Sequence, residues 1–198
     1  MIYFEYGEKE LAHFHKKDKK LSAVIKRIGM IKRKVNPDPF SALVESVIGQ
    51  QISGKAAATV RDKLDALCGL KADKLHSMTT EEIQACGMSR RKAGYIKGIA
   101  GAAVTKAVDF DKLKDRTDQE IIEAITKLNG VGIWTAEMLL IFSFMRPDVV
   151  SYGDLAIRRG MMELYGHKEL PEERFSRYAK RYSPYGTTAS LYLWELSH

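Results

Sequence analysis

Apolar residues along this chain recur at intervals of three and four, which is the spacing of helices that bury one face. The alternation of apolar and polar residues that indicates a strand is scarce. A typical helix start stands at Asp38 and Pro39, where an N-cap residue precedes a proline at the first helical position. The apolar face of the helix that follows comprises Phe40, Leu43, Val44, Val47 and Ile48. We expect this helix to be largely buried.

Two capping boxes mark further helix starts, because each pairs a threonine with a glutamate three residues later. They are Thr79 with Glu82 and Thr117 with Glu120. Helical periodicity predicts other helices over residues 8–17, 21–29, 55–69, 89–107, 134–145, 155–166, 171–182 and 187–198. The chain has no internal repeat and no linker that would separate independent domains. The sequence therefore predicts an all-α fold of about ten helices joined by short turns.

Glycine recurs within the segment 89–107, at Gly94, Gly98 and Gly101. Glycine is unfavourable in the interior of a helix. These three positions therefore indicate close packing or bends in this helix.

Composition and charge narrow the class of protein. Of the 198 residues, 45% are hydrophobic, as is ordinary for a folded soluble chain. Lysine and arginine outnumber aspartate and glutamate by 32 to 25, which favours polyanionic partners such as nucleic acid. Cys68 and Cys86 are too few for a disulfide framework, and the five histidines lack metal-ligand spacing. The longest apolar stretch, residues 136–145, has about half the length that a membrane span needs. We expect the protein to be cytoplasmic and monomeric.

Two closely spaced glycines, Gly130 and Gly132, separate two predicted helices in the stretch KLNGVGIW. They suggest a four-residue hairpin, residues 129–132, in which positive φ or tight turning points backbone N–H groups outward. Beside the positive end of the next helix dipole, such N–H groups can bind a DNA phosphate without sequence preference. The alternative is an ordinary glycine-closed turn between antiparallel helices, and the hairpin alone leaves both open.

Asp154 stands twenty residues after Trp134, at the start of another predicted helix. Aspartate is a favoured N-cap, so a purely structural role is one interpretation. A carboxylate held rigidly at a helix start can also stabilise a positive sugar centre or orient a water molecule. The two roles are compatible.

Five segments in order resemble the helix-hairpin-helix (HhH-GPD) DNA glycosylase superfamily, and specifically the 3-methyladenine DNA glycosylase II family. They are FSALVESVIGQQISGKAA, GMSRRKAGYIKGIA, LNGVGIWTA, VVSYGDLAIRRG and SPYGTTASLYLWELS, and the similarity covers about residues 36–198. The resemblance implies an all-α, two-lobed fold with a central cleft. One lobe would comprise about residues 36–135, and the other residues 1–35 with 136–198. The first 35 residues cannot supply the N-terminal β-rich domain of larger members, which indicates a short form.

The resemblance also implies roles for individual residues. Gly130, Val131 and Gly132 match the hairpin that binds phosphate, and Asp154 matches the catalytic aspartate. Gln51 matches the position that wedges into the gap left by the flipped nucleotide, although a polar turn residue is the alternative.

The residues that match the base pocket are Trp134, Trp194 and Met138, although core packing is the alternative for both tryptophans. In the branch of the superfamily that nicks the strand, a lysine occupies the position of Trp134 and attacks the sugar. Tryptophan has no such amine, so we expect no lyase activity. An indole face can instead attract a cationic base.

The implied reaction is hydrolytic excision of alkylated purines, such as 3-methyladenine and 7-methylpurines, from double-stranded DNA during base excision repair. A purine alkylated at N3 or N7 is already cationic and departs without a strong general acid. No cofactor is required in this interpretation, although the family's hairpin carbonyls can hold a monovalent cation. The iron–sulfur branch of the superfamily requires four cysteines near the C-terminus. It is excluded, since no cysteine follows Cys86.

Two alternatives to this function stay open. One is the same fold acting on a neutral lesion such as hypoxanthine, uracil or 8-oxoguanine, and the other is a non-catalytic DNA-binding module. Basic side chains that could include phosphate contacts are Lys16, Lys17, Lys19, Lys20, Arg90, Arg91, Lys92, Arg158 and Arg159.

Overall fold

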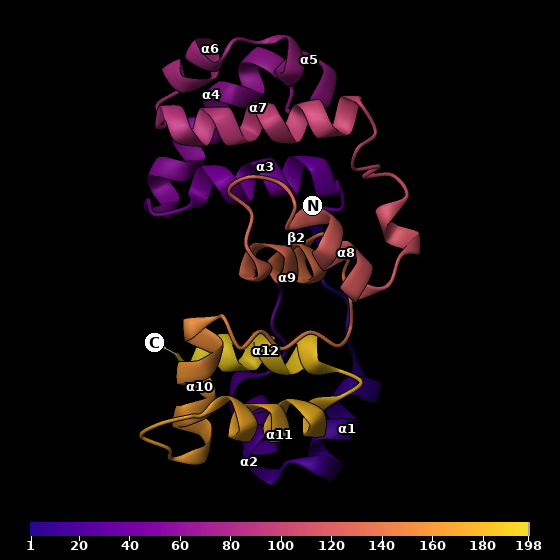
Figure 1. The fold of residues 1–198 in the computed structure, drawn as a ribbon. Helices are drawn as coiled ribbons and strands as arrows, with labels where there is room; N and C mark the ends of the chain where they lie inside the picture. Colours follow the sequence, from indigo (N-terminus) through magenta and orange to yellow (C-terminus); the bar gives the residue numbers. More distant parts are fainter. Residues whose placement is uncertain (198) are drawn as a thin grey trace. The chain divides into compact units, whose positions relative to one another are not determined.

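The computed structural model describes residues 1–197, which fold almost entirely into helices (Figure 1). Its twelve α-helices in the described range are α1 (Glu8–Lys17), α2 (Lys19–Ile28), α3 (Pro39–Gly49), α4 (Gly54–Cys68), α5 (Ala72–Ser77), α6 (Thr80–Ala85), α7 (Arg90–Val104), α8 (Asp118–Ile125), α9 (Ile133–Phe142), α10 (Leu155–Tyr165), α11 (Glu172–Tyr182) and α12 (Gly186–Leu196). A 3₁₀ turn covers Leu113–Asp115, and two short strands, β1 (Ile2–Tyr3) and β2 (Lys34–Val35), pair antiparallel. None of the described helices is both long and apolar enough to cross a membrane.

The chain divides into two compact units. The inserted unit comprises residues 36–139, and the terminal unit combines residues 1–35 with the chain from residue 140 onward. Helix α9 begins in the inserted unit, and its last three residues belong to the terminal unit.

The inserted unit is built around α3 and α7, which lie side by side (Figure 1). As predicted, Asp38 caps α3 by accepting hydrogen bonds from the backbone N–H groups of Phe40 and Ser41 at 3.1 and 3.3 Å. The apolar face predicted for α3 is buried. Both predicted capping boxes are also confirmed, at α6 and α8. These starts could be predicted because each depends on neighbours in the sequence.

The elements that the sequence did not predict are short. Helix α5 has six residues, and Lys71 at its N-cap makes no side-chain capping bond. Strands β1 and β2 are two residues long, which is too short for a period of two to be visible. One helix ends earlier than predicted: the helix predicted over 187–198 ends at Leu196. His198 lies outside the described residues.

Close packing explains only one of the three glycines of α7. A Cβ atom added to Gly101 would lie 3.4 Å from the His76 ring, whereas one added to Gly94 or Gly98 would meet no atom within 4 Å. The prediction of close packing is therefore wrong for Gly94 and Gly98. The helix runs unbroken through all three.

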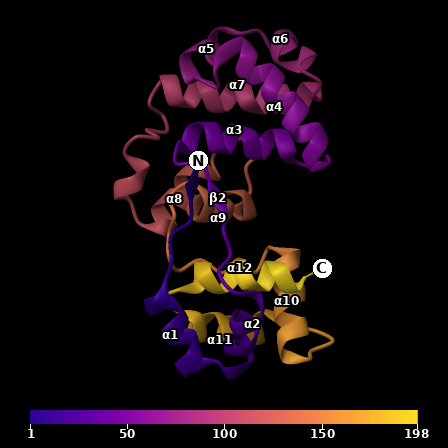
Figure 2. The same ribbon diagram turned by 180° about the vertical axis from the view of Figure 1, so that it is seen from behind.

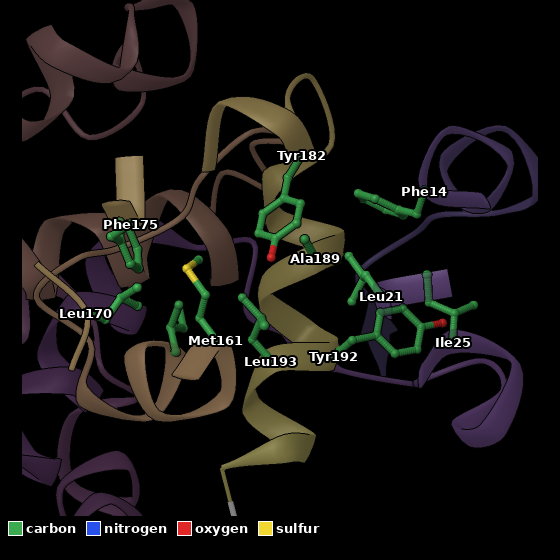
Figure 3. Packing of buried hydrophobic residues seen from close by; sticks show 11 residues of the cluster. Phe14, Leu21, Ile25, Met161, Leu170, Phe175, Tyr182, Ala189, Tyr192 and Leu193 are labelled. Carbon is green, nitrogen blue, oxygen red and sulfur yellow. The ribbon is translucent and has the colours of Figure 1, made fainter. Parts of the chain in front are cut away.

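Helix α12 forms the centre of the terminal unit, and it packs against α2, α10 and α11 (Figures 2 and 3). Its residues Ala189, Tyr192 and Leu193 join a buried apolar cluster. The other members of that cluster are Phe14, Leu21, Ile25, Ile157, Met161, Leu170, Phe175 and Tyr182. Gly160 of α10 lies so close to α12 that an added Cβ would be 1.9 Å from the Leu193 carbonyl oxygen. Only glycine permits this separation of α10 and α12.

A buried polar network closes the end of the terminal unit formed by α2, α10 and α11. Asp18 caps α2 and also accepts hydrogen bonds from the Tyr165 hydroxyl and from Arg181, the latter at 3.0 Å. Because Tyr165 donates its proton to Asp18, the Tyr182 hydroxyl, 2.8 Å away, donates to Tyr165. Burial raises the pKa of both phenols, so both stay protonated.

Candidate functional site

Asp154 is the N-cap of α10, so the capping role predicted for it is confirmed. Its Oδ1 atom accepts a hydrogen bond from the Ile157 backbone N–H at 2.9 Å and another from the Trp194 indole N–H at 3.2 Å. The residue is only 6% exposed. The carboxylate is therefore oriented by two donors, one from its own helix and one from α12.

Trp194 is itself held by several contacts within the terminal unit. Its ring stacks on Phe142, with centroids 5.4 Å apart, and the Arg33 guanidinium carbon lies 5.8 Å from the ring centroid. Arg33 also forms an ion pair with Glu195, the next residue of α12, at 3.3 Å. The base-pocket role that the resemblance implies for Trp194 stays a prediction, and the structure in addition places its N–H on the Asp154 carboxylate. Sequence reasoning missed this contact because the two residues are forty positions apart.

The segment before Asp154 is fastened to the start of α12. The Thr187 hydroxyl accepts a hydrogen bond from the Val149 N–H at 3.0 Å, and the Ser190 hydroxyl donates to the Val149 carbonyl at 2.9 Å. Asp148 accepts from the Gly186 N–H at 2.9 Å, and an added Cβ at Gly186 would lie 2.7 Å from that carboxylate. The stretch SPYGTTAS is thus an anchor for the chain that leads to Asp154.

The connection between α8 and α9 is longer than predicted. It comprises residues 126–132, seven residues in place of the four predicted. The difference arises because the end of α8 tightens: the N–H of Leu128 donates to the Ile125 carbonyl at 3.1 Å, three residues back. The Val131 N–H then donates to the Leu128 carbonyl at 3.1 Å, and Val131 is buried. We call residues 126–132 the hairpin.

The two glycines of the hairpin differ in their surroundings. Gly130 has a φ of +85°, and an added Cβ would lie 2.2 Å from the Tyr95 ring of α7. Gly132 has no positive φ, and an added Cβ would meet no atom within 4 Å. A positive φ, one of the two conformations expected for these glycines, is therefore confirmed at Gly130 and does not occur at Gly132. The fold requires Gly130, whereas Gly132 leaves open space before the first turn of α9.

Gln51 lies in the exposed turn between α3 and α4, in a left-handed conformation with a φ of +58°. A non-glycine residue in this region is uncommon. The neighbouring Gln50 donates from Nε2 to the Gly130 carbonyl at 2.9 Å. The structure therefore brings the turn that carries Gln51 and the hairpin together within the inserted unit.

Lys92 of α7 supports the same turn. Its ammonium donates to the Ile48 carbonyl at 2.8 Å and to the Gln50 carbonyl. Burial lowers the pKa of this ammonium. Lys92 was among the side chains that could contact phosphate, but the structure directs its donors to these carbonyls. Lys92 and Tyr95 lie one turn apart on α7, so this helix contacts both the turn that carries Gln51 and the hairpin.

Trp134 and Met138 stand one turn apart on α9 and differ in exposure. Trp134 is 43% exposed and Met138 is 8% exposed. Of these two residues predicted for the base pocket, Trp134 is therefore the one with substantial accessible surface.

The family model described as HhH-GPD superfamily base excision DNA repair protein matches residues 44–184. The chain belongs to the HhH-GPD superfamily. Membership predicted from the five sequence segments is thereby confirmed, as is the all-α fold.

Individual relatives within the superfamily are similar over most of this chain. DNA-3-methyladenine glycosylase 1 of Schizosaccharomyces pombe is 32% identical over 166 residues, which cover 81% of this chain and 73% of that protein. The crystal structure of a DNA-3-methyladenine glycosidase from Bacillus halodurans has a TM-score of 0.87 and 34% identity, covering 100% of this chain and 93% of that one. The structure of a 3-methyladenine DNA glycosylase from Schizosaccharomyces pombe in complex with abasic DNA has a TM-score of 0.83 and 28% identity, with coverages of 95% and 96%.

No cluster of three or more histidine, cysteine, aspartate or glutamate side chains suited to a metal ion occurs among residues 1–197. Cys68 and Cys86 are free and buried, and burial raises the pKa of both thiols.

The glycines of the superfamily's hairpin should differ in their effect on stability. Gly130→Ala should lower the free energy of unfolding by about 1–3 kcal/mol, because it adds a left-handed strain and a clash with Tyr95. Gly132→Ala should change it by less than about 0.5 kcal/mol, since nothing surrounds the added methyl. Urea unfolding of both variants measures the difference. Equal losses would mean that the hairpin does not have the described conformation.

Proposed function

We propose that this protein is a monofunctional DNA glycosylase that excises alkylated purines, such as 3-methyladenine and 7-methylpurines, from double-stranded DNA in base excision repair. The observation that carries the proposal is the buried Asp154 carboxylate, which two N–H donors orient. The relatives named as 3-methyladenine DNA glycosylases, and the one bound to abasic DNA, support the choice of substrate.

The carboxylate acts on the charge that develops at the sugar. As the N-glycosidic bond breaks, the deoxyribose acquires oxocarbenium character. A fixed negative charge stabilises this state without reorganising during the reaction. Asp154 supplies this charge, or positions the attacking water, while Trp194 and the α10 backbone keep Oδ1 in place.

The leaving base requires little help from the protein when it is already cationic. Trp134 offers an exposed indole face that attracts such a base by cation–π contact. Trp194 contributes its aromatic surface beside Asp154, and Met138 supports the helix one turn after Trp134.

The inserted unit binds the DNA backbone in this proposal. Gly130, Val131 and Gly132 form the turn at the start of α9, where N–H groups and the helix dipole favour a phosphate. The open space at Gly132 lets a phosphate approach the backbone. Gln51 fills the gap that the flipped nucleotide leaves, and the ordered turn around it reduces the entropy lost on insertion.

A monovalent cation would fit the hairpin's chemistry. The carbonyls of Leu128 and Gly130 each accept one hydrogen bond, and a carbonyl oxygen has a second lone pair. When bound, such a cation adds positive charge near a phosphate, and the reaction itself needs no cofactor.

Gly132→Val should weaken binding to lesion-containing and undamaged duplexes by the same factor, because the lost contact is to phosphate and carries no base information. Fluorescence anisotropy with both duplexes measures the two affinities. Ala66→Val, on the exposed side of α4, is a matched control that should bind normally. Unchanged affinity of Gly132→Val for both duplexes would remove the hairpin from the DNA-binding surface.

Asp154→Asn should keep the cap and both hydrogen bonds to Oδ1, while it removes the negative charge. We expect a small change in melting temperature and a loss of about 10²–10³-fold or more in the single-turnover rate of methylpurine release. Affinity for lesion duplex should persist or increase. A substrate panel that includes hypoxanthine, uracil and 8-oxoguanine duplexes tests the lesion class in the same assay.

Asp38→Asn is the matched control, because Asp38 caps α3 with a similar extended backbone conformation. It should retain normal base release. If Asp154→Asn released bases at nearly the rate of the unmodified protein, Asp154 would be a cap and nothing more.

Borohydride should trap no covalent protein–DNA adduct during the reaction, and the product strand should stay intact until heat or alkali is applied. The reason is that Trp134 has no amine to form a Schiff base. A denaturing gel of the trapping reaction, run beside a lysine-bearing member of the superfamily, gives the comparison. Adduct at a comparable level would show that another amine is the nucleophile.

A further inference from the structure

A groove of about 420 Å³ runs between α7 and the hairpin, within the inserted unit. Its α7 side is formed by Arg91, Gly94 and Gly98, which share one face of that helix, and its other side includes Lys127 and Asn129. We call it the α7 groove. The Asp154 chemistry does not use it, and neither hairpin glycine lines it.

All charged side chains that line the α7 groove are basic. Arg90, Arg91 and Lys127 line it, and no acidic side chain does. Arg90 forms an exposed ion pair with Glu81 at 3.1 Å. For the exposed Arg91 and Lys127, no ion pair or hydrogen bond through the side chain is found in the described part of the chain. Two uncompensated cations therefore face this groove.

Another basic groove of the inserted unit, beside α8, differs in this respect. Three of its four cations have partners within it, because Lys106 and Lys112 pair with Asp109, and Arg116 pairs with Glu120. The fourth is Lys127, which lines both grooves. Arg91 is therefore the unpaired cation that distinguishes the α7 groove from the groove beside α8.

The two glycines of the groove have no explanation in the fold. Gly94 and Gly98 lie inside a helix, where glycine is unfavourable, and an added Cβ at either would meet nothing within 4 Å. Their effect is to leave the α7 side of the groove without side chains at these two positions. A ligand can therefore approach the helix backbone between Arg91 and Lys127.

We propose that the α7 groove binds a second phosphate of the DNA backbone, separate from the one at Gly132. The inference rests on the proposed function and extends it. Arg91 and Lys127 neutralise the phosphate, the side of α7 at Gly94 and Gly98 admits it with its sugar, and Asn129 offers an amide N–H. The groove makes no base contact in this arrangement, so it increases affinity without sequence preference.

The first test is the salt dependence of binding to an undamaged duplex. Replacing Arg91 and Lys127 together by alanine should reduce the slope of log K against log salt concentration by about 1, since one neutralised phosphate contributes about 1. The control Lys63→Ala with Lys74→Ala removes the same charge from exposed positions outside the groove and should leave the slope nearly unchanged. Equal reductions in both double variants would overturn the proposal in favour of a general field effect.

The second test separates blocked binding from misfolding. Gly98→Ala should raise the melting temperature by about 2–4 °C, because it improves helix propensity in open space. Gly98→Leu should fold equally well, place a bulky side chain in the groove and weaken duplex binding. Normal binding by a folded Gly98→Leu variant would show that no phosphate occupies the groove.

The third test locates the contact on the DNA. The unmodified protein and the double alanine variant at Arg91 and Lys127 are compared on duplexes shortened from either end. Their difference in affinity should vanish once the duplex lacks the flank that the groove contacts. A loss that is independent of flank length would contradict a backbone contact there. These measurements use undamaged DNA, so they test the α7 groove even if the protein does not release bases. Conversely, a negative result for the groove would not affect the test of Asp154.

Discussion

The hydrogen bond from the Trp194 indole to the Asp154 carboxylate is the contact on which the role proposed for Asp154 depends. A hydrogen bond to a charged group contributes about 1.5–3 kcal/mol, but its value here lies in orientation. It exists only because α12 passes very close to α10, which Gly160 permits, and because the start of α12 holds the segment before Asp154. A larger side chain at Gly160 would shift the indole relative to the carboxylate. The apolar cluster and the network around Asp18 stabilise the same helices from further away.

The features of the fold that could be predicted are those encoded by near neighbours. Asp38 and Pro39 define the start of α3, and the threonine–glutamate pairs define α6 and α8, because each cap satisfies N–H groups within three residues. Helix α5 lacks such a cap, and it is too short for its periodicity to be recognised. The strands β1 and β2 form because residues more than thirty positions apart meet, which no local pattern records.

The candidate site was predictable as a set of motifs but not as a set of contacts. Motif resemblance placed Gly130 and Gly132 in the same role. Only the position of Tyr95, far earlier in the chain, shows that the fold requires the first glycine and not the second. Likewise, Lys92 is a basic residue in the sequence, and its carbonyl partners emerge only when α7 packs beside the end of α3.

Gln51 shows how backbone geometry restricts the choice of side chain at an exposed position. Its φ of +58° is a conformation that β-branched residues adopt only with strain. Valine, isoleucine and threonine are therefore poorly tolerated at this point of the turn, whatever their ability to fill a gap between bases. An unbranched side chain such as glutamine reaches outward from its Cβ without crowding the turn. Substitutions that preserve this turn are therefore limited to residues that accept the left-handed conformation, which restricts the side chains available for the wedge role proposed for Gln51.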